Sequence, residues 1–442
     1  MHTVTTAPES SAKTSLFAGV TFYHWVVVII ASCCWLFDCM DQRLFTLARE
    51  PAMRSLLASD PERLAVIKSY LGYATASMLV GWATGGIIFG MLSDKIGRVK
   101  TMAVALLLYA GFTGLSGLAH SWVAFFFYRF LAGIGIGGIF GAATALVAES
   151  VPGQFRSLAL GSLQALSAVG NIVGSLISLK IKPSQPNFWG EYEGWRVLFF
   201  VGILPALLVV PTLFILREPE AWKNAKAAAA QGAKRVGSIA ELFRDRRWRR
   251  NTVVGLFLGL AGMIGLWGIG FFSPELIRTA LSHEPQSVTD AVIGRGTALQ
   301  DVGAFIGMLV FTFVASFLNR RIAFLGSLIL SGAVTMFVFK SLNSAADAYW
   351  MLPLMGFAQL SVFAGYSIYF PELFPTRLRG TGVGFCYNTV RYITATGPIL
   401  LGSLSSTMGF RNAAMAMSFV YVIGVIALIW APETKGQPLP QD

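Results

Sequence analysis

Residues 149–161 read ESVPGQFRSLALG, and residues 372–384 read ELFPTRLRGTGVG. The two stretches share the pattern E-x-x-P-x-x-x-R-x-x-x-x-G and lie 223 residues apart in a chain of 442. Each copy follows an apolar segment and leads into another. A repeat at about half the chain length indicates two halves that are built alike.

The composition is that of a membrane protein. Hydrophobic residues make up 55% of the chain and charged residues 13%, and the mean hydropathy is +0.63, whereas a soluble protein carries roughly 25% charged residues. The apolar runs are about 18 residues or longer and almost free of charges, so they predict transmembrane helices. Two similar halves made of such helices are the construction of a secondary transporter.

We therefore predict an all-α membrane protein with twelve spans in two pseudo-symmetric six-helix bundles. The first bundle is expected in residues 1–216, a connecting segment in 217–250 and the second bundle in 251–442. The first six spans are expected near 22–46, 70–92, 101–119, 122–147, 157–179 and 195–216. The second six are expected near 251–273, 292–317, 322–340, 349–370, 381–405 and 411–431.

The net charge of +12 is explained by membrane topology rather than by nucleic-acid binding. The connecting segment 217–250 is basic, and more Lys and Arg residues fall in loops on the same side. Positive loops face the cytoplasm, so this segment and both termini are expected there. Compact loops favour a bacterial inner membrane, and no cleavage pattern of a signal peptide precedes the first span. The segment could bind anionic lipid or a partner, but its charge is expected from topology alone.

The loop between the second and third spans carries a recognisable motif. Residues 90–100 read GMLSDKIGRVK and resemble the signature loop of the major facilitator superfamily, G-x-x-x-D-R/K-x-G-R-R/K. In that family the loop latches the two halves in the outward-facing state. The second half keeps only Asn319-Arg320-Arg321 at the equivalent place, so the resemblance implies an asymmetric latch.

Two further stretches support the resemblance, which covers nearly the whole chain. Residues 129–138, RFLAGIGIGG, match the family's fourth helix, and residues 217–222, REPEAW, are similar to the end of the sixth helix in sugar and organic-ion transporters. The resemblance implies gating residues at the cytoplasmic face that do not contact substrate. They are Asp94, Arg98, Glu149, Arg156, Glu372 and Arg379.

Two carboxylates, Asp38 and Asp41, lie inside the first span. A carboxylate in a membrane helix costs about 2.5–3.5 kcal/mol on insertion scales, so it marks a functional site by default. Their spacing places both on one helix face, about 5–6 Å apart at Cβ, and their repulsion favours a proton on one of them. The pair resembles the D-G-x-D motif of metabolite:proton symporters for aromatic acids, sialate, monocarboxylates and related organic anions, with Cys39 replacing the glycine. The alternative is that Asp41 caps the helix end and pairs with Arg43.

Two arginines also lie at membrane depth. Arg129 could pair with Asp38 or Asp41, face a substrate carboxylate, or extend to the membrane surface. Arg391 lies near the middle of the eleventh span without an acidic neighbour in sequence, and its planar fork suits a carboxylate. Similar organic-anion symporters use an arginine in this helix as the counter-charge of the substrate. The alternative is a structural pair between Arg391 and Asp301.

Asp301, in the eighth span, could pair with Arg391 or Arg295, or serve as a second proton site. Other polar residues occupy spans that the family uses for its central cavity, although each could instead form an interhelical hydrogen bond. The predicted substrate site comprises Arg391, Asn388, Asp301, Gln300, Gln164, Tyr366 and Gln359. Asn171, Tyr369 and Tyr387 are further polar candidates.

Nothing in the sequence indicates an enzyme. It contains no phosphate-binding loop, dinucleotide fingerprint or nucleophile elbow, and its four cysteines lack metal-ligand spacing. We therefore expect no cofactor and no metal, and transport must draw on a gradient.

The predicted function is proton-coupled uptake of a small organic anion, most simply a carboxylate. Asp38 and Asp41 would carry the proton, Arg129 would modulate their proton affinity, and Arg391 would hold the substrate. The alternatives are a sugar or polyol transporter, an organic-cation or drug exporter, and a sensor without net flux. The seventh span contains no glutamine, which argues against the sugar branch. We expect a monomer in membrane lipid, with protons and the substrate as ligands and no nucleic acid.

Overall fold

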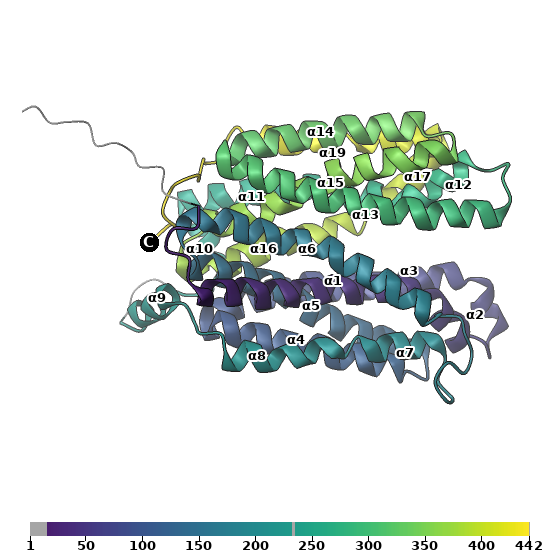
Figure 1. Cartoon of the computed structure of the whole chain (residues 1–442), viewed down its shortest axis with the longest axis horizontal. Coiled ribbons are helices and arrows are strands. Elements are labelled where there is room, and N and C mark those ends of the chain that lie inside the picture. The colour runs from purple at the N-terminus through teal and green to yellow at the C-terminus, as the bar shows by residue number, and fades with distance from the viewer. Residues whose placement is uncertain (1–15, 232–234, 442) are drawn as a thin grey trace, which may run out of the picture.

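The computed structural model describes residues 16–231 and 235–441 as helices joined by short loops (Figure 1). The helices run side by side along the long axis and form two lobes. The first lobe comprises α1 (Phe22–Leu56), α3 (Ile67–Ile96), α4 (Arg98–Gly117), α5 (Trp122–Ser150), α6 (Gly153–Lys180) and the run α7 (Gly194–Val201), η1 (Leu204–Leu208) and α8 (Val209–Phe214).

The first helical run of the second lobe contains a wide π-helical turn, η2. The lobe comprises α11 (Arg246–Met263), η2 (Ile264–Ile269), η3 (Gly270–Phe272), α12 (Ser273–Ala280), α13 (Gln286–Phe317), α14 (Arg320–Ser341), α15 (Ala345–Leu373), η4 (Thr376–Leu378), α16 (Arg379–Thr394), α17 (Gly397–Met408), α18 (Phe410–Met417) and α19 (Val420–Ala427).

The two ends of the molecule differ. The connecting helices α9 (Glu220–Ala230) and α10 (Ile239–Arg244) lie with the C-terminus at one end, which we call the linker end (Figure 1). The short helix α2 (Pro61–Ala65) and α12 lie at the opposite end, which we call the far end (Figure 1). Whatever passes through the molecule must travel between these two ends.

Eleven helical runs in the described part of the chain are long and apolar enough to cross a membrane. The predicted span at 381–405 is instead divided into α16 and α17, because Pro398 has no N–H to continue the helical ladder. The first helix continues to Leu56 rather than ending near residue 46. The extension places Arg43 well before the end of the helix, and the contact of Arg43 is described at the site below.

The glycine-rich stretch of α5 allows neighbouring helices to approach closely. A Cβ atom at Gly133 would lie 2.3 Å from the carbonyl oxygen of Met78, and one at Gly137 would lie 2.2 Å from that of Trp82. Both contacts are with α3, so glycine is needed where these two backbones meet. The stretch that resembles the family's fourth helix is therefore explained by packing.

The sequence repeat forms the same local turn twice. Arg156 Nε donates to the carbonyl oxygen of Ala148 at 3.0 Å, and Arg379 Nε donates to that of Pro371 at 2.9 Å. In both copies the acceptor is the residue just before the glutamate of the repeat. The equal spacing of glutamate and arginine in the two copies thus reflects the same helix-joining turn, which is formed once in each half.

Carboxylates from the segments after each lobe bind the starts of α4 and α14. Glu218 accepts from three consecutive backbone N–H groups at the start of α4, at 2.7–3.2 Å. Glu433 accepts from the first two N–H groups of α14 at 3.0 and 3.1 Å. Burial raises the pKa of Glu433, but its backbone donors outweigh burial and hold the pKa below its usual value. The two caps fix equivalent helix starts in the two lobes.

Candidate functional site

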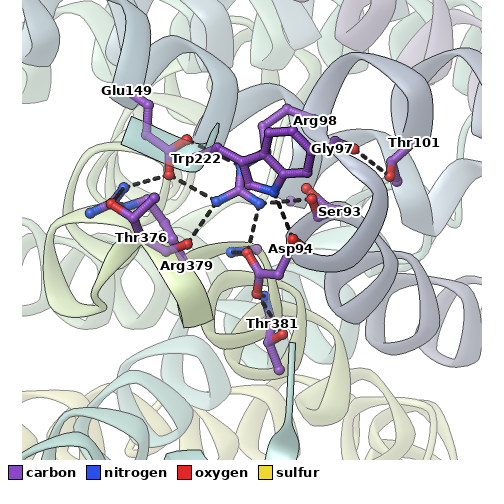
Figure 2. A network of polar contacts seen from close by, with 12 residues as sticks. Ser93, Asp94, Gly97, Arg98, Thr101, Glu149, Trp222, Thr376, Arg379 and Thr381 are labelled. Carbon is purple, nitrogen blue, oxygen red and sulfur yellow. Dashed lines mark hydrogen bonds and ion pairs between the residues drawn. The ribbon is translucent and has the colours of Figure 1, made fainter. Parts of the chain in front are cut away.

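The two lobes meet at the linker end through buried charged side chains, shown in Figure 2. Asp94, near the end of α3, accepts hydrogen bonds from Arg98 Nη1 at 2.8 Å and from the backbone N–H of Gly380 at 2.9 Å. Its other carboxylate oxygen accepts from the backbone N–H of Thr381 at 2.8 Å and from its hydroxyl at 2.6 Å. Asp94 of the first lobe therefore binds the first turn of α16 in the second lobe.

Glu149, at the end of α5, extends this network across the lobe boundary. It accepts from Arg98 Nη2 at 2.9 Å and from Arg379 Nη1 of the second lobe at 2.5 Å. Arg98 also donates to the carbonyl oxygen of Thr376 in the second lobe at 2.8 Å. Asp94, Arg98, Glu149 and Arg379 are fully buried, so two carboxylates balance two guanidinium groups. Removing one member of such a set costs about 3–5 kcal/mol, because a buried charge is left uncompensated.

The second half builds only part of this network. Glu372 pairs with Arg320 at 2.9 Å, as Glu149 pairs with Arg98 in the first half. The position four residues before Arg320, where the first half has an aspartate, holds Ser316, whose hydroxyl donates to a carbonyl of its own helix at 2.7 Å. The predicted gating residue Arg156 makes its hydrogen bond within the first lobe.

Inside the first lobe, Asp41 of α1 and Arg129 of α5 form a fully buried ion pair. Arg129 Nη2 lies 3.1 Å from Asp41 Oδ2, and Arg129 Nη1 lies 3.4 Å from the hydroxyl of Thr113. The guanidinium carbon lies 4.8 and 5.2 Å from the ring centres of Phe45 and Phe199. Of the alternatives for Arg129, the structure has the pairing with Asp41, and the side chain does not extend to the membrane surface.

Asp38 lies one helical turn before Asp41 and is also fully buried. Neither of its carboxylate oxygens has a hydrogen-bond partner among the described residues. Asp41 repels it, and Arg391 of the second lobe is close enough to attract it. A buried carboxylate without a hydrogen bond is costly when ionised, so either a proton or the charge of Arg391 must compensate it.

Arg391 of α16 lies at the boundary between the lobes. Its guanidinium carbon lies 3.7 Å from the ring centre of Trp82, in α3 of the first lobe, and 5.0 Å from that of Tyr387. Arg391 Nε donates to Asn388 at 3.3 Å, and Asn388 is held by its own bond to the carbonyl oxygen of Gly384. Arg391 Nη1 is buried and has no hydrogen-bond partner in the described chain. The guanidinium is thus fixed in place while one donor group stays free.

Aromatic rings from both lobes extend the surface around this guanidinium. Tyr387 stacks on Phe140 of the first lobe with 4.0 Å between ring centres, and Phe140 contacts Trp35 at 4.9 Å. Trp82, on the other side of the guanidinium, lies beside Trp267 of the second lobe, with 6.4 Å between ring centres. The indole nitrogens of Trp35 and Trp82 are buried without a partner among the described residues. Flat rings beside a fixed cation suit an anion that has a planar apolar body.

A second ion pair joins the lobes between Arg43 of α1 and Asp301 of α13. Both side chains are partly exposed, at 23% and 15%. Both suggested partners of Asp301, Arg391 and Arg295, were therefore wrong, and so was the suggested pair between Asp41 and Arg43. Arg43 lies inside α1, and its side chain reaches Asp301 of the other lobe instead of Asp41.

The other predicted polar residues divide into two groups. Gln359, Tyr366 and Gln300 each form a hydrogen bond to another helix of the second lobe, at 2.8, 2.6 and 2.9 Å. These are the interhelical hydrogen bonds that the sequence analysis gave as the alternative to substrate contact. Gln164 of α6 is buried, and its carbonyl oxygen has no partner in the described chain, which is also true of the carbonyl oxygen of Gln359. Gln164 therefore remains a candidate for substrate contact, and Gln359 is only partly satisfied by its interhelical bond.

Sequence reasoning missed the contacts that three residues make: it named Arg43 only as a partner for Asp41, and it did not single out Thr381 or Trp82. Arg43 carried a usable signal, since it is a charge close to Asp41 in an apolar segment. Thr381 stands in the repeat, but its contact with Asp94 depends on how the two lobes meet. Trp82 stands among apolar residues of the second span, and only the packing of α3 against α16 reveals its contact with the guanidinium.

The sequence profile of the Major Facilitator Superfamily matches residues 31–393. The chain belongs to the Major Facilitator Superfamily. The transporter is 30% identical to the cis,cis-muconate transport protein of Acinetobacter baylyi over 368 residues, which cover 81% of this chain and 84% of that protein. It is 24% identical to the benzoate transport protein of the same organism, with 92% and 90% of the two chains covered.

The fold is also that of a solved superfamily structure. The proton:xylose symporter XylE bound to 6-bromo-6-deoxy-D-glucose superimposes with a TM-score of 0.77 at 19% identity, over 94% of this chain and 98% of that chain. This likeness shows the fold alone. Together, the findings confirm the predicted all-helical fold and family: the transporter is a multi-pass membrane protein of a transport family and not an enzyme.

Proposed function

We propose that the transporter takes up a small organic carboxylate together with protons, by alternating access between its two lobes. The observation that carries the proposal is the placement of Asp38 and Arg391. They come from opposite lobes, both side chains are buried, and each keeps a polar group without a hydrogen-bond partner among the described residues. Buried charges of this kind are maintained at membrane depth for function rather than stability.

The chemistry around Arg391 supports a carboxylate with a planar, unsaturated body. Arg391 Nη1 is free to donate to an anion, and a charge-assisted bond of this kind is among the strongest available in a buried site. Trp82 and Tyr387 lie against the guanidinium and make its surroundings aromatic. Muconate and benzoate, after which two relatives are named, have this combination of a carboxylate and a flat unsaturated body.

Charge balance at the same site supports coupling to protons. In the empty site an ionised Asp38 compensates Arg391. A substrate carboxylate that binds Arg391 would leave one unbalanced negative charge in a low-dielectric region, unless Asp38 takes up a proton. Substrate and proton therefore favour each other's binding, and this linkage is reciprocal. Asp41 is less suited to the exchange, because Arg129 already compensates it.

Alternating access requires that each end of the site can open. The Asp94 network joins the lobes at the linker end, and Arg43 and Asp301 join them through α1 and α13. We assign the Asp94 network as the cytoplasmic latch and the Arg43–Asp301 pair as the gate on the opposite side. The concentration of arginines at the linker end supports this orientation in a bacterial inner membrane.

Uptake into proteoliposomes tests the proposal. The panel consists of a labelled dienoate, an aromatic monocarboxylate, a sugar acid and a neutral pentose, each measured with and without an inwardly directed proton gradient. The gradient should raise accumulation of the first two, with little transport of the pentose. Carboxylate flux that ignores the gradient would exclude symport, and transport of the pentose alone would exclude the anion site.

A further inference from the structure

A groove of about 1220 Å³ lies on the surface of the second lobe, where α11 and α19 run beside each other from the linker end. It is separate from the residues proposed to bind substrate and proton. It is lined by Asp245, Arg246, Arg247, Arg249, Arg250, Val253, Val254, Phe257, Ile423, Ile426, Ala427 and Trp430. We call it the α11–α19 groove.

One end of the groove is strongly basic. Arg246, Arg247, Arg249 and Arg250 are all exposed, and none of them forms an ion pair with an acidic side chain in residues 16–231 or 235–441. The acidic lining residue, Asp245, is already used, because it accepts from backbone N–H groups at the start of α11 at 2.7 and 3.4 Å. The four guanidinium groups therefore keep positive charge and N–H donors that no acidic side chain of the described residues uses.

The other end of the groove is apolar. Val253 and Phe257 of α11 are 40% and 46% exposed, and Ile426 of α19 is 48% exposed. These residues belong to helical runs that cross the membrane, so their exposed faces meet acyl chains rather than water. Trp430 also lines the groove and is 57% exposed, and tryptophan is enriched at membrane interfaces.

We propose that the α11–α19 groove binds one anionic phospholipid. The phosphate would accept hydrogen bonds from the arginines of the first turns of α11, and an acyl chain would lie along the apolar wall formed by Phe257 and Ile426. A soluble phosphate would use the basic end alone and leave the apolar wall without a role. A zwitterionic lipid would bring an ammonium group toward four uncompensated arginines, so the charge of the groove selects an anionic headgroup.

Native mass spectrometry of the delipidated full-length transporter tests this proposal, with phosphatidylglycerol and phosphatidylethanolamine as the probes. Phosphatidylglycerol should bind with the higher affinity. The triple variant Arg246→Gln/Arg249→Gln/Arg250→Gln should lose about tenfold or more of that affinity, since each basic side chain contributes to the attraction. The matched control, Lys223→Gln/Lys226→Gln/Arg244→Gln, removes the same charge from the same end of the molecule but outside the groove, and should bind as the wild type does.

A second pair of variants tests the apolar wall without changing charge. Val253→Trp should block the acyl chain and weaken phosphatidylglycerol binding, whereas Val422→Trp on the exposed face of α19, outside the groove lining, should not. Thermal unfolding without lipid confirms that each variant is folded. Equal binding of the two lipids, equal binding by the two triple variants, or competition by glycerol phosphate at the lipid's own affinity would overturn the proposal. None of these outcomes depends on transport.

Discussion

At the scale of single residues, Asp38 and Asp41 share a helix face but not an environment. Asp41 is compensated by Arg129 at 3.1 Å, whereas both oxygens of Asp38 lack a hydrogen-bond partner in the described chain. Asp38→Asn mimics the protonated side chain, so it should abolish gradient-driven accumulation while substrate counterflow stays within about threefold of wild type. Substrate affinity should weaken as pH rises in the wild type, because a proton must bind with the carboxylate, and should not vary with pH in the variant.

Asp41→Asn is the contrasting change. It leaves the guanidinium of Arg129 buried without its counter-charge, so we expect a loss of about 3–5 kcal/mol in folding free energy. Thermal unfolding in detergent would detect this loss, and Asp38→Asn should show no loss of that size. If Asp38→Asn still accumulated substrate against a gradient, the proton site would have to lie elsewhere.

Arg391 allows a second test at this scale. Lysine keeps the charge but lacks the flat fork that lies against Trp82 and reaches Asn388, so Arg391→Lys should weaken carboxylate binding by about tenfold and Arg391→Gln by more. Quenching of tryptophan fluorescence on substrate binding gives the dissociation constant, because Trp82 lies against the guanidinium. Unchanged affinity in Arg391→Gln would remove the proposed anion site, and the melting temperature controls for misfolding.

At the scale of elements, the latch depends on how α3 meets the first turn of α16. Asp94→Asn removes the charge that accepts from Gly380 and Thr381 of the opposite lobe. Because one guanidinium of the buried set is then left uncompensated, we expect the form with the linker end closed to lose about 3–5 kcal/mol of stability. Spin labels at Lys100 and Arg321 should then report a larger share of long distances at that end.

The chain supplies a control for this change within its own second half. Ser316 stands at the position equivalent to Asp94, but its hydroxyl bonds within its own helix. Ser316→Ala should therefore leave the distances at the linker end as they are in the wild type. An equal shift in both variants would show that the aspartate has no special part in holding the lobes together.

Sequence patterns predicted the elements well and their contacts less well. Hydropathy and the repeat at residues 149–161 and 372–384 predicted the helical lobes, because helix formation in a membrane depends on local apolar length. Partners such as Arg43 for Asp301 could not be predicted. That pair depends on how the two lobes dock, which is decided by tertiary packing. The division between α16 and α17 carried a local signal in Gly397-Pro398, but its effect on the helix depends on its surroundings.

At the scale of the whole molecule, the lobes are joined on both sides of the proposed substrate site, so opening one side requires specific contacts to break. Arg43→Asp or Asp301→Arg alone places like charges together and should favour the form that is open at the far end. The double variant restores an ion pair with reversed polarity and should recover much of the wild-type uptake. For a partly exposed pair we expect a coupling energy of about 1 kcal/mol.

Distances between spin labels at Glu62 and Glu284, both exposed near the far end, would follow this opening. The same labels in Asp94→Asn act as a reference, because that change loosens the opposite end. Additive effects of the two single variants, with no recovery in the charge swap, would show that Arg43 and Asp301 do not act as one gate.

The opposed charges of Asp38 and Arg391 also bear on leakage. A carrier that returned through the membrane with a proton but no cargo would expose an arginine with no anion, and one loaded with cargo alone would hold two anions against one cation. Both half-loaded forms are penalised by the low dielectric of the surroundings. In the proposed symport, only the empty and the doubly loaded carrier would cross easily, so the cell would neither dissipate its ion-motive force through idle cycles nor lose accumulated nutrient back to the medium.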